Sequence, residues 1–510
     1  MTSQPTHTLY RGARIESPAV PGADAMLVRG ADIVWMGNQA QAPSGDFHIE
    51  QLEGIVLPAF VDSHVHTTAT GLAQTGLDLS QCRGANDLLD KLSMQSGDLV
   101  IGHGWDETRW EIPTLPTPAE LDRAAPGTKV YLSRVDVHSA LVSPRLRAAV
   151  DGLEGATGYS ARGALSRDAH HQIRTLVLSA LTSSQRRTVQ SGTLTHAARR
   201  GVGAIHECGG PLISGEDDFT ELLALAKSQG GVEVTGFWGE FDPRKAREMG
   251  AVSAGGDLFV DGSFGSRTAL LREPYTDDAG RGFSYTHVDE IAQHLVACVR
   301  ENIAAGFHAI GDAAIAAVLE GYAKAAATVG TTALREGRHR LEHAELLDAG
   351  LIRGLVEYGL TVSAQPAFDA RWGGPGGMHE QRLGAGRAAQ LNPLAALYNV
   401  GVPVVFGSDS PVTPIAPWAA LRGACRPHHE QHAVSVKTAF AAHTRAPWRS
   451  IGNDSCGVLA PGALASFAVW RADDIADPSA LLRAVVDSEE DPMCERTVVR
   501  GRDVFRADVG

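Results

Sequence analysis

The chain has 510 residues, a length that suits one large catalytic domain with a smaller one better than a single small core. Its formal net charge of −14 and its scattered arginines argue against a nucleic-acid partner. No apolar run approaches the length of a membrane span, and the polar stretch Met1–Tyr10 lacks the apolar core of a signal peptide. The six cysteines form no CxxC pair, which favours free thiols in a reducing compartment. We therefore expect a cytoplasmic protein with a small-molecule substrate and no membrane partner, and a homodimer is the oligomer to test.

Both ends of the chain alternate short β-type runs with turn residues. These runs are Thr8–Ile15, Ala25–Arg29, Ile33–Met36, Leu464–Trp470 and Arg496–Phe505. The pattern predicts one small β-sandwich domain formed by the N- and C-terminal segments, residues 1–56 and 456–510.

The middle of the chain, residues 57–455, alternates short apolar runs with segments of helical period such as 290–305, 313–329 and 346–358. Strand and helix alternation over this length predicts a (β/α)8 barrel. A segment rich in Pro, Gly and Arg, residues 111–174, interrupts the rhythm and is expected to be an insertion near the barrel mouth. The apolar runs include Ile55–Phe60, Lys129–Leu132, Gly203–His206, Leu258–Val260, Ala305–Ile310, Arg340–Ala344, Leu360–Ala364 and Val402–Gly407.

Two histidines, His64 and His66, stand two residues apart at the end of the first of these runs. In a strand, residues i and i+2 point to the same side, so both imidazoles face one point. Converging neutral imidazoles are natural ligands for zinc or a similar ion. A surface histidine pair at a strand end is the alternative, because a bare HxH occurs often by chance.

Three more residues of metal-binding type, His308, His343 and Asp409, lie at or near the ends of predicted strands. Each alone has an ordinary explanation: a core histidine, a partner that orients Glu342, and a cap for the following turn. In a (β/α)8 barrel, however, the C-terminal strand ends all face the same mouth. Taken together, in order on separate strands, these residues predict a metal site.

A series of longer motifs runs in order through nearly the whole chain and resembles the amidohydrolase superfamily. The resemblance is specifically to its amidohydrolase-3 branch, the hydrolases similar to N-substituted formamide deformylases and exoenzyme-regulatory proteins. It implies a metal-dependent (β/α)8 barrel with a β-sandwich from both termini, and hydrolysis of a carbon–nitrogen but not peptide bond by metal-activated water. The motifs are PAFVDSHVH (58–66), GHGWDETRW (102–110), LSRVDVH (132–138), DLFVDGSFGSRTALL (257–271), HAIGDAA (308–314), RLEHAELL (340–347), SAQP (363–366), GSDSPV (407–412) and GVLAPGALASFAVW (457–470).

The resemblance also implies roles for single residues. Asp409 would contact the metal and shuttle the proton, and His343 would bind metal or polarise the substrate carbonyl. The implied metal ligands are His64, His66, His308, His343 and Asp409. The implied substrate contacts are Trp105, Asp106, Asp136, His138 and Arg267.

One position departs from the family pattern. Many members with two metals carry a carboxylated lysine just before the fourth-strand motif, whereas this chain has Asp257 there. Either Asp257 or Glu207 replaces the bridge, or the site holds one ion. Because an aspartate is much shorter than a carboxylated lysine, we expect one divalent ion per subunit, with zinc as the expected metal.

Two alternative functions stay open at this point. The same metal site suits hydrolysis of an ester, lactone or phosphoester. A non-catalytic barrel that binds a metal or ligand would be expected to lack part of the water-activating set, yet Asp409 and the four histidines are all present. A serine hydrolase is disfavoured because no GxSxG elbow accompanies Ser408 or Ser410.

Overall fold

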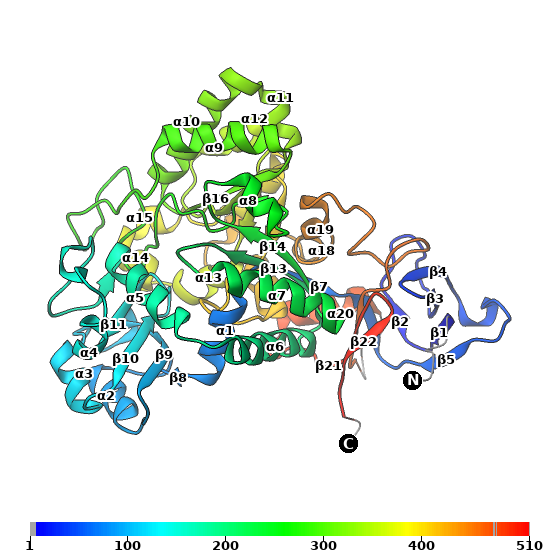
Figure 1. Ribbon diagram of the computed structural model, residues 1–510. Helices are drawn as coiled ribbons and strands as arrows, with labels where there is room; N and C mark the ends of the chain where they lie inside the picture. Colours follow the sequence, from blue (N-terminus) through cyan, green and yellow to red (C-terminus); the bar gives the residue numbers. More distant parts are fainter. Residues whose placement is uncertain (1–6, 473–474, 476, 509–510) are drawn as a thin grey trace.

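The computed structural model describes residues 7–472, 475 and 477–508 (Figure 1). The outermost residues of the expected terminal segments, 1–6 and 509–510, lie outside this described part.

Eight parallel strands form the central sheet, and they follow one another around it in chain order. The ring nearly closes between the last strand and the first, where Val65 and Ser410 form a parallel bridge. The (β/α)8 barrel expected from the sequence is therefore confirmed. Its strands are β7 (Phe60–Val65), β13 (Val202–Gly209), β14 (Glu233–Trp238), β15 (Ser253–Ala254), β16 (Ala304–Ala309), β17 (Arg340–His343), β18 (Thr361–Ala364) and β19 (Val404–Phe406).

Helices cover the outside of the barrel, so its strands are buried on both faces and read as continuous apolar runs. The expected helix 290–305 is α9 (Val288–Glu301), which ends where Asn302 takes a left-handed φ of 52° and caps it. The helices between and after the barrel strands are α1 (Thr67–Thr75), α6 (Ser183–Arg199), α7 (Glu216–Gln229), α8 (Pro243–Glu248), α9, α10 (Asp312–Val329), α11 (Thr331–Glu336), α12 (Ala349–Tyr358), α13 (Pro366–Trp372), α14 (Met378–Leu383), α15 (Ala385–Ala388), α16 (Leu394–Asn399), α17 (Pro417–Cys425), α18 (Val436–Ala442) and α19 (Arg445–Ser450).

The fourth barrel strand differs from its prediction. The run Leu258–Val260 contributes only one bridge, between Phe259 and His308, and the strand itself is β15. The chain turns away after β15 because Gly256 has a φ of +86°, a left-handed conformation that favours glycine. This turn carries Asp257 over the barrel mouth instead of into the ladder.

A separate five-stranded sheet interrupts the barrel between α1 and α6. The run Lys129–Leu132 lies in this sheet and not in the barrel, and the interruption begins well before the expected residue 111. The strands are β8 (Leu77–Asp78), β9 (Leu99–Trp105), β10 (Lys129–Arg134), β11 (Ser139–Val142) and β12 (Leu165–Ser166). The helices are α2 (Ala85–Ser93), α3 (Pro118–Ala124), α4 (Pro144–Arg147) and α5 (Arg167–Ser179).

Two further sheets lie beside the barrel, on the right of Figure 1. One is built from the N-terminal segment alone, and the other joins both ends of the chain through antiparallel pairing of Val56 with Val469. Tyr10, Met26 and Phe467 share one apolar core. No helix in the described part of the chain is long and apolar enough to cross a membrane. The elements are β1 (His7–Arg11), β2 (Arg14–Ile15), β3 (Ala25–Arg29), β4 (Asp32–Gly37), β5 (His48–Gln51), β6 (Ile55–Pro58), β20 (Phe467–Trp470), α20 (Pro478–Asp487), β21 (Cys494–Val499) and β22 (Arg502–Arg506).

Candidate metal centre

The first barrel strand, β7, delivers His64 and His66 to the mouth, as their two-residue spacing predicts. The Nε2 atom of His66 lies 3.1 Å from Asp257 Oδ2 and 3.1 Å from Asp409 Oδ1. The Nε2 atom of His64 lies 3.4 Å from each of the same two oxygens. Both imidazoles therefore face the same pair of carboxylate oxygens.

His308 and His343, from β16 and β17, form the opposite side of the centre. His343 Nε2 lies 3.0 Å from His308 Nδ1, so the two rings present these nitrogens to one point. Asp257 Oδ1 lies 3.3 Å from that His308 nitrogen and 3.7 Å from His343 Nε2. The fifth and sixth strands thus supply a second pair of imidazoles to the same aspartate.

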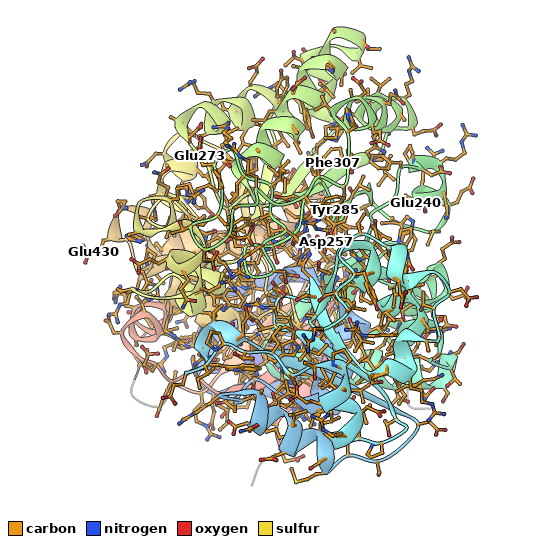
Figure 2. All side chains as sticks on the ribbon, turned by 90° about the vertical axis from the view of Figure 1, so that its left-hand side faces the viewer. Glu240, Asp257, Glu273, Tyr285, Phe307 and Glu430 are labelled. Carbon is orange, nitrogen blue, oxygen red and sulfur yellow. The ribbon has the colours of Figure 1, made fainter. Side chains whose placement is uncertain are left out.

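Asp257 stands between these two pairs of histidines. Its Oδ2 atom faces His64 and His66, and its Oδ1 atom faces His308 and His343. Burial alone would raise the pKa of Asp257, but the neighbouring imidazoles, His64 foremost, hold that pKa well below its usual range. Figure 2 labels this ionised carboxylate near the middle of the molecule.

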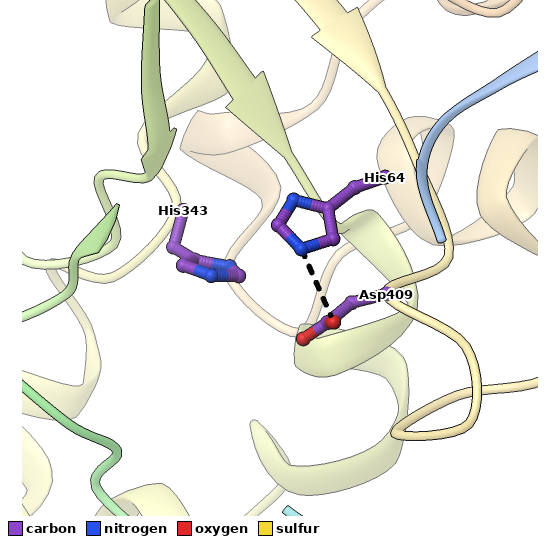
Figure 3. A group of neighbouring side chains, drawn as sticks. All are labelled: His64, His343 and Asp409. Carbon is purple, nitrogen blue, oxygen red and sulfur yellow. Dashed lines mark ion pairs between the residues drawn. The ribbon is translucent and has the colours of Figure 1, made fainter. Parts of the chain in front are cut away.

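Asp409 completes the centre from the loop after β19, where its backbone N–H donates to the His64 carbonyl oxygen at 2.8 Å. Figure 3 shows the rings of His64 and His343 and the Asp409 carboxylate turned towards one another. Asp409 and His343 both have left-handed φ values, 54° and 68°. Residues other than glycine rarely adopt this strained conformation, and it persists mainly at functional sites.

The imidazoles of His64, His66 and His343 are each oriented by a hydrogen bond on Nδ1, the ring nitrogen that points away from the centre. His64 Nδ1 donates to Glu342 Oε2, and His66 Nδ1 donates to the Cys208 carbonyl oxygen, both at 2.8 Å. His343 Nδ1 lies 2.8 Å from Gln365 Oε1. Such bonds fix the tautomer that leaves Nε2 free to bind a metal.

The donor set fits a divalent metal ion. His64 Nε2 is buried without a hydrogen-bond partner, an arrangement that is costly unless something binds there. Burial alone would lower the pKa of His66, but Asp257 and Asp409 raise it to about 9, so this environment attracts positive charge. His64 also belongs to ligand-distance groups with His66 and Asp257, and with His343 and Asp409.

Arg340 holds Glu342 in place beneath the centre. Its Nε and Nη2 atoms donate to Glu342 at 2.5 and 2.8 Å, and both residues are buried. Arg340→Met would leave the Glu342 carboxylate buried beside only an imidazole. We expect this to destabilise the fold by about 3–5 kcal/mol. Thermal unfolding of the metal-free protein measures it, so that lost metal does not contribute.

Arg244→Met is the matched control, because the Arg244 ion pair with Glu301 lies at the surface. We expect its unfolding midpoint to stay close to that of the wild type. If Arg340→Met unfolded at the wild-type temperature, the carboxylate would have to be stabilised by another group.

Two cavities meet at the centre, and His138, His308 and Asp409 line both. The first, called here the apolar chamber, runs between the barrel and the inserted sheet. Besides the shared residues it is walled mainly by Leu72, Ile101, Val177, Leu178, Ile213 and Phe259. The second chamber is walled mainly by Phe264, Glu345, Phe368, Trp372, Met378 and His379.

The structure separates the expected substrate contacts into two groups. His138 lines both chambers, and burial followed by the charge of His308 lowers its pKa to about 3, so its imidazole is neutral. Asp136 lines the second chamber, where it accepts a hydrogen bond from Ser263 at 2.7 Å and pairs with Arg134.

The other three expected contacts lie outside the walls of both chambers. Trp105 is 1% exposed and donates to the Leu132 carbonyl oxygen within the inserted sheet. Asp106 pairs with Arg134 and accepts from the Trp372 indole. Arg267 reaches Asp277 at 2.6 Å near the surface. These three side chains contact other residues of the protein in this structure, and their role as substrate contacts stays a prediction.

Several residues of the site were not assigned a role from the sequence. Glu342 and Gln365 stood within quoted motifs, and their position two residues from other buried polar groups was the available signal. Glu207, considered as a bridge, instead accepts hydrogen bonds from the backbone and side chain of Thr67. Arg174, which lines the apolar chamber, lies in an insertion whose sequence carries no recognisable pattern.

A model of the amidohydrolase family matches residues 53–505. The chain belongs to this family. It is 28% identical over 497 residues to the Bacillus subtilis protein YtcJ, a match that covers 88% of this chain and 89% of that protein. It is 23% identical over 510 residues to the N-substituted formamide deformylase of Arthrobacter pascens, covering 89% and 91%.

The fold is also similar to that of a solved structure. The structure of an uncharacterized metal-dependent hydrolase from Pyrococcus furiosus superposes with a TM-score of 0.71 at 23% identity, covering 90% of this chain and 97% of that one. The resemblance to the amidohydrolase family stated from the motifs is therefore confirmed.

Proposed function

We propose that this amidohydrolase cleaves a carbon–nitrogen bond outside peptides: an amide, formamide, cyclic amide or related group. The observation that carries the proposal is the position of Asp409. Its carboxylate reaches both histidines of β7 and also lines both chambers. The Asp409 carboxylate thus faces the metal ligands and both of the chambers that a substrate would occupy. The N-substituted formamide deformylase relative supports the same bond class.

The chain's own residues then have distinct tasks. When bound, a divalent ion at these ligands lowers the pKa of a coordinated water and polarises the substrate oxygen. Asp409 accepts the proton of the attacking water and passes it to the leaving nitrogen, a transfer that general acid–base catalysis requires. The neutral imidazole of His138, at the junction of the chambers, is placed to donate a hydrogen bond to the substrate.

We propose two metal ions and not the single ion expected from the sequence. That expectation rested on the short side chain of Asp257, but Asp257 follows the turn at Gly256 and its carboxylate already lies among the four histidines. The two carboxylate oxygens already face different histidine pairs. Asp257 would therefore hold both ions, the role that the family resemblance gives to a carboxylated lysine.

Asp257→Ala tests the count. We expect bound metal to fall from about two ions per chain to one or fewer, because paired ions lie roughly 3.5–4 Å apart and need a shared ligand. Elemental analysis of the purified protein measures this. Glu207→Gln is the control, since Glu207 is also a buried acid but bonds to Thr67, and its metal content should not change. If the wild type binds only one ion per chain, the proposal of two ions is wrong and the single ion expected from the sequence is correct.

A substrate panel tests the reaction. The metal-loaded protein is assayed with N-formyl amines, N-acyl amines and cyclic amides, and in parallel with esters, lactones and phosphoesters. We expect turnover of at least one carbon–nitrogen class at a rate that removal of metal by a chelator abolishes. Turnover confined to the oxygen-linked substrates would replace the proposal with an esterase, lactonase or phosphoesterase. No turnover of any class would favour a binding barrel.

A further inference from the structure

Arg134, Arg340 and Arg174 lie around the centre, and only the first two have carboxylate partners among the described residues. Arg134 and Arg340 are buried, whereas Arg174 is half-buried. Arg134 pairs with Asp106, Glu107 and Asp136, and Arg340 pairs with Glu342. The third, Arg174 on α5, lines the apolar chamber, and no carboxylate of the described residues lies within ion-pair distance of it.

The groups that Arg174 does contact are neutral. Its Nη2 atom contacts His171 Nδ1 at 2.9 Å and donates to the Leu212 carbonyl oxygen, and Nη1 donates weakly to the Val137 carbonyl oxygen at 3.5 Å. Its Nε–H is buried and has no hydrogen-bond partner. The guanidinium thus keeps one buried donor without a partner, and it has no ion-pair partner among the described residues at the wall of this chamber.

A half-buried cation without an ion-pair partner, whose Nε–H is itself buried and unbonded, is costly and calls for an explanation. Burial lowers the pKa of Arg174, whereas the Glu342 carboxylate raises the pKa of Arg340, although Arg340 is the more deeply buried of the two. Apolar side chains, among them Leu72, Val177 and Phe259, line the same chamber as Arg174. The chamber reaches the metal centre at His308 and Asp409. A planar guanidinium in such surroundings matches a carboxylate, which it can bind through two parallel hydrogen bonds.

We propose that the apolar chamber takes a substrate arm made of an apolar chain that ends in a carboxylate, and that Arg174 binds that carboxylate. The proposal rests on the proposed function for the placement of the reacting bond at Asp409. It narrows the substrates to carbon–nitrogen compounds that carry an anionic group at a distance from the reacting carbon. The apolar walls contact the chain, and the charge fixes its end.

The test uses binding, so that it does not depend on turnover. Linear dicarboxylates (glutarate, adipate and suberate) and the monocarboxylates of matching length are titrated calorimetrically into the protein loaded with its metal. We expect at least one dicarboxylate to bind about ten- to a hundredfold more tightly than its monocarboxylate, as charge-assisted bonds to Arg174 would give. In Arg174→Gln this preference should vanish while monocarboxylate binding stays.

Arg167→Gln is the matched control, because Arg167 is on the same helix but stacks over Phe283 instead of lining a chamber. It should keep the preference. If Arg174 only tied the Leu212 and Val137 loops to α5, its replacement would weaken both ligand classes equally, which would overturn the proposal. A wild type that does not prefer dicarboxylates would also overturn the proposal. So would a preference that is lost only in Arg371→Gln, which removes another arginine without a carboxylate partner among the described residues.

If Arg174→Gln does not fold or bind metal, Arg174→Lys is measured in its place. A lysine keeps the charge but loses the two-pronged geometry, so the preference should fall several-fold without vanishing. An unchanged preference would overturn the proposal. Turnover then gives an independent comparison, between N-formyl ω-amino acids and N-formyl alkylamines of equal length. Absence of turnover with an intact dicarboxylate preference would refute the proposed function and leave the carboxylate site standing.

Discussion

Replacing Asp409 by asparagine is expected to lower kcat by about 10²–10⁴-fold while the fold and bound metal survive. Asparagine has nearly the same size, and its amide oxygen can still lie against His64 and His66. It cannot accept the proton of the attacking water or return one to the leaving nitrogen. Steady-state kinetics on the substrate found in the panel, with elemental analysis of the same preparation, measure both parts of the prediction.

The control for this variant is Asp289→Asn, which changes an exposed aspartate that pairs with Lys324 on the outer helices. We expect it to retain the wild-type kcat. A near-normal rate in Asp409→Asn with full metal content would assign the proton transfer to another group. A loss of metal in Asp409→Asn would instead show that the carboxylate acts chiefly as a ligand.

The second large effect is expected from His64→Ala and His66→Ala. Each change removes an imidazole that faces both carboxylates of the centre. Even residues that only orient a ligand typically contribute 10–100-fold to metal affinity, so we expect a loss of more than about 100-fold. Equilibrium metal competition measures the affinity, and turnover should disappear in the same variants.

His48→Ala serves as the control, because His48 lies in the terminal sheet beside Glu50 and is half exposed. It should bind metal as the wild type does. If both β7 variants retained stoichiometric metal at wild-type affinity, the centre described here would not be the metal site.

Much of the fold was predictable because its signals are local. The burial of the barrel strands on two faces gives continuous apolar runs such as Val404–Phe406, and helical periodicity marks α10 and α12. Where the prediction was wrong, the pairing of strands in the tertiary structure determined the sheet to which a run belongs. The run Lys129–Leu132 is as apolar as a barrel strand, but it pairs with β9 in the inserted sheet. Local composition cannot distinguish these two partners.

The metal-site residues show the same division. The spacing of His64 and His66 is a property of one strand, so their convergence could be expected from the sequence. The position of Asp257 could not be expected from the sequence, because it depends on the turn at Gly256 and on four imidazoles from three different strands. Side-chain length alone therefore gave the expectation of a single ion.

The sequence by itself determined the barrel, the family and the set of histidines and aspartates, because periodicity, motif order and strand spacing are encoded in short stretches of chain. Only the tertiary structure decided which of these groups share a point, which carboxylate stands between them and which arginine has no ion-pair partner among the described residues. Arg174 is an unremarkable arginine in its own helix. Arg174 lacks an ion-pair partner because of what α5, the loop at Leu212 and the barrel mouth bring close to it. Whether a charge has a partner depends on distances in space, which the order of residues does not contain.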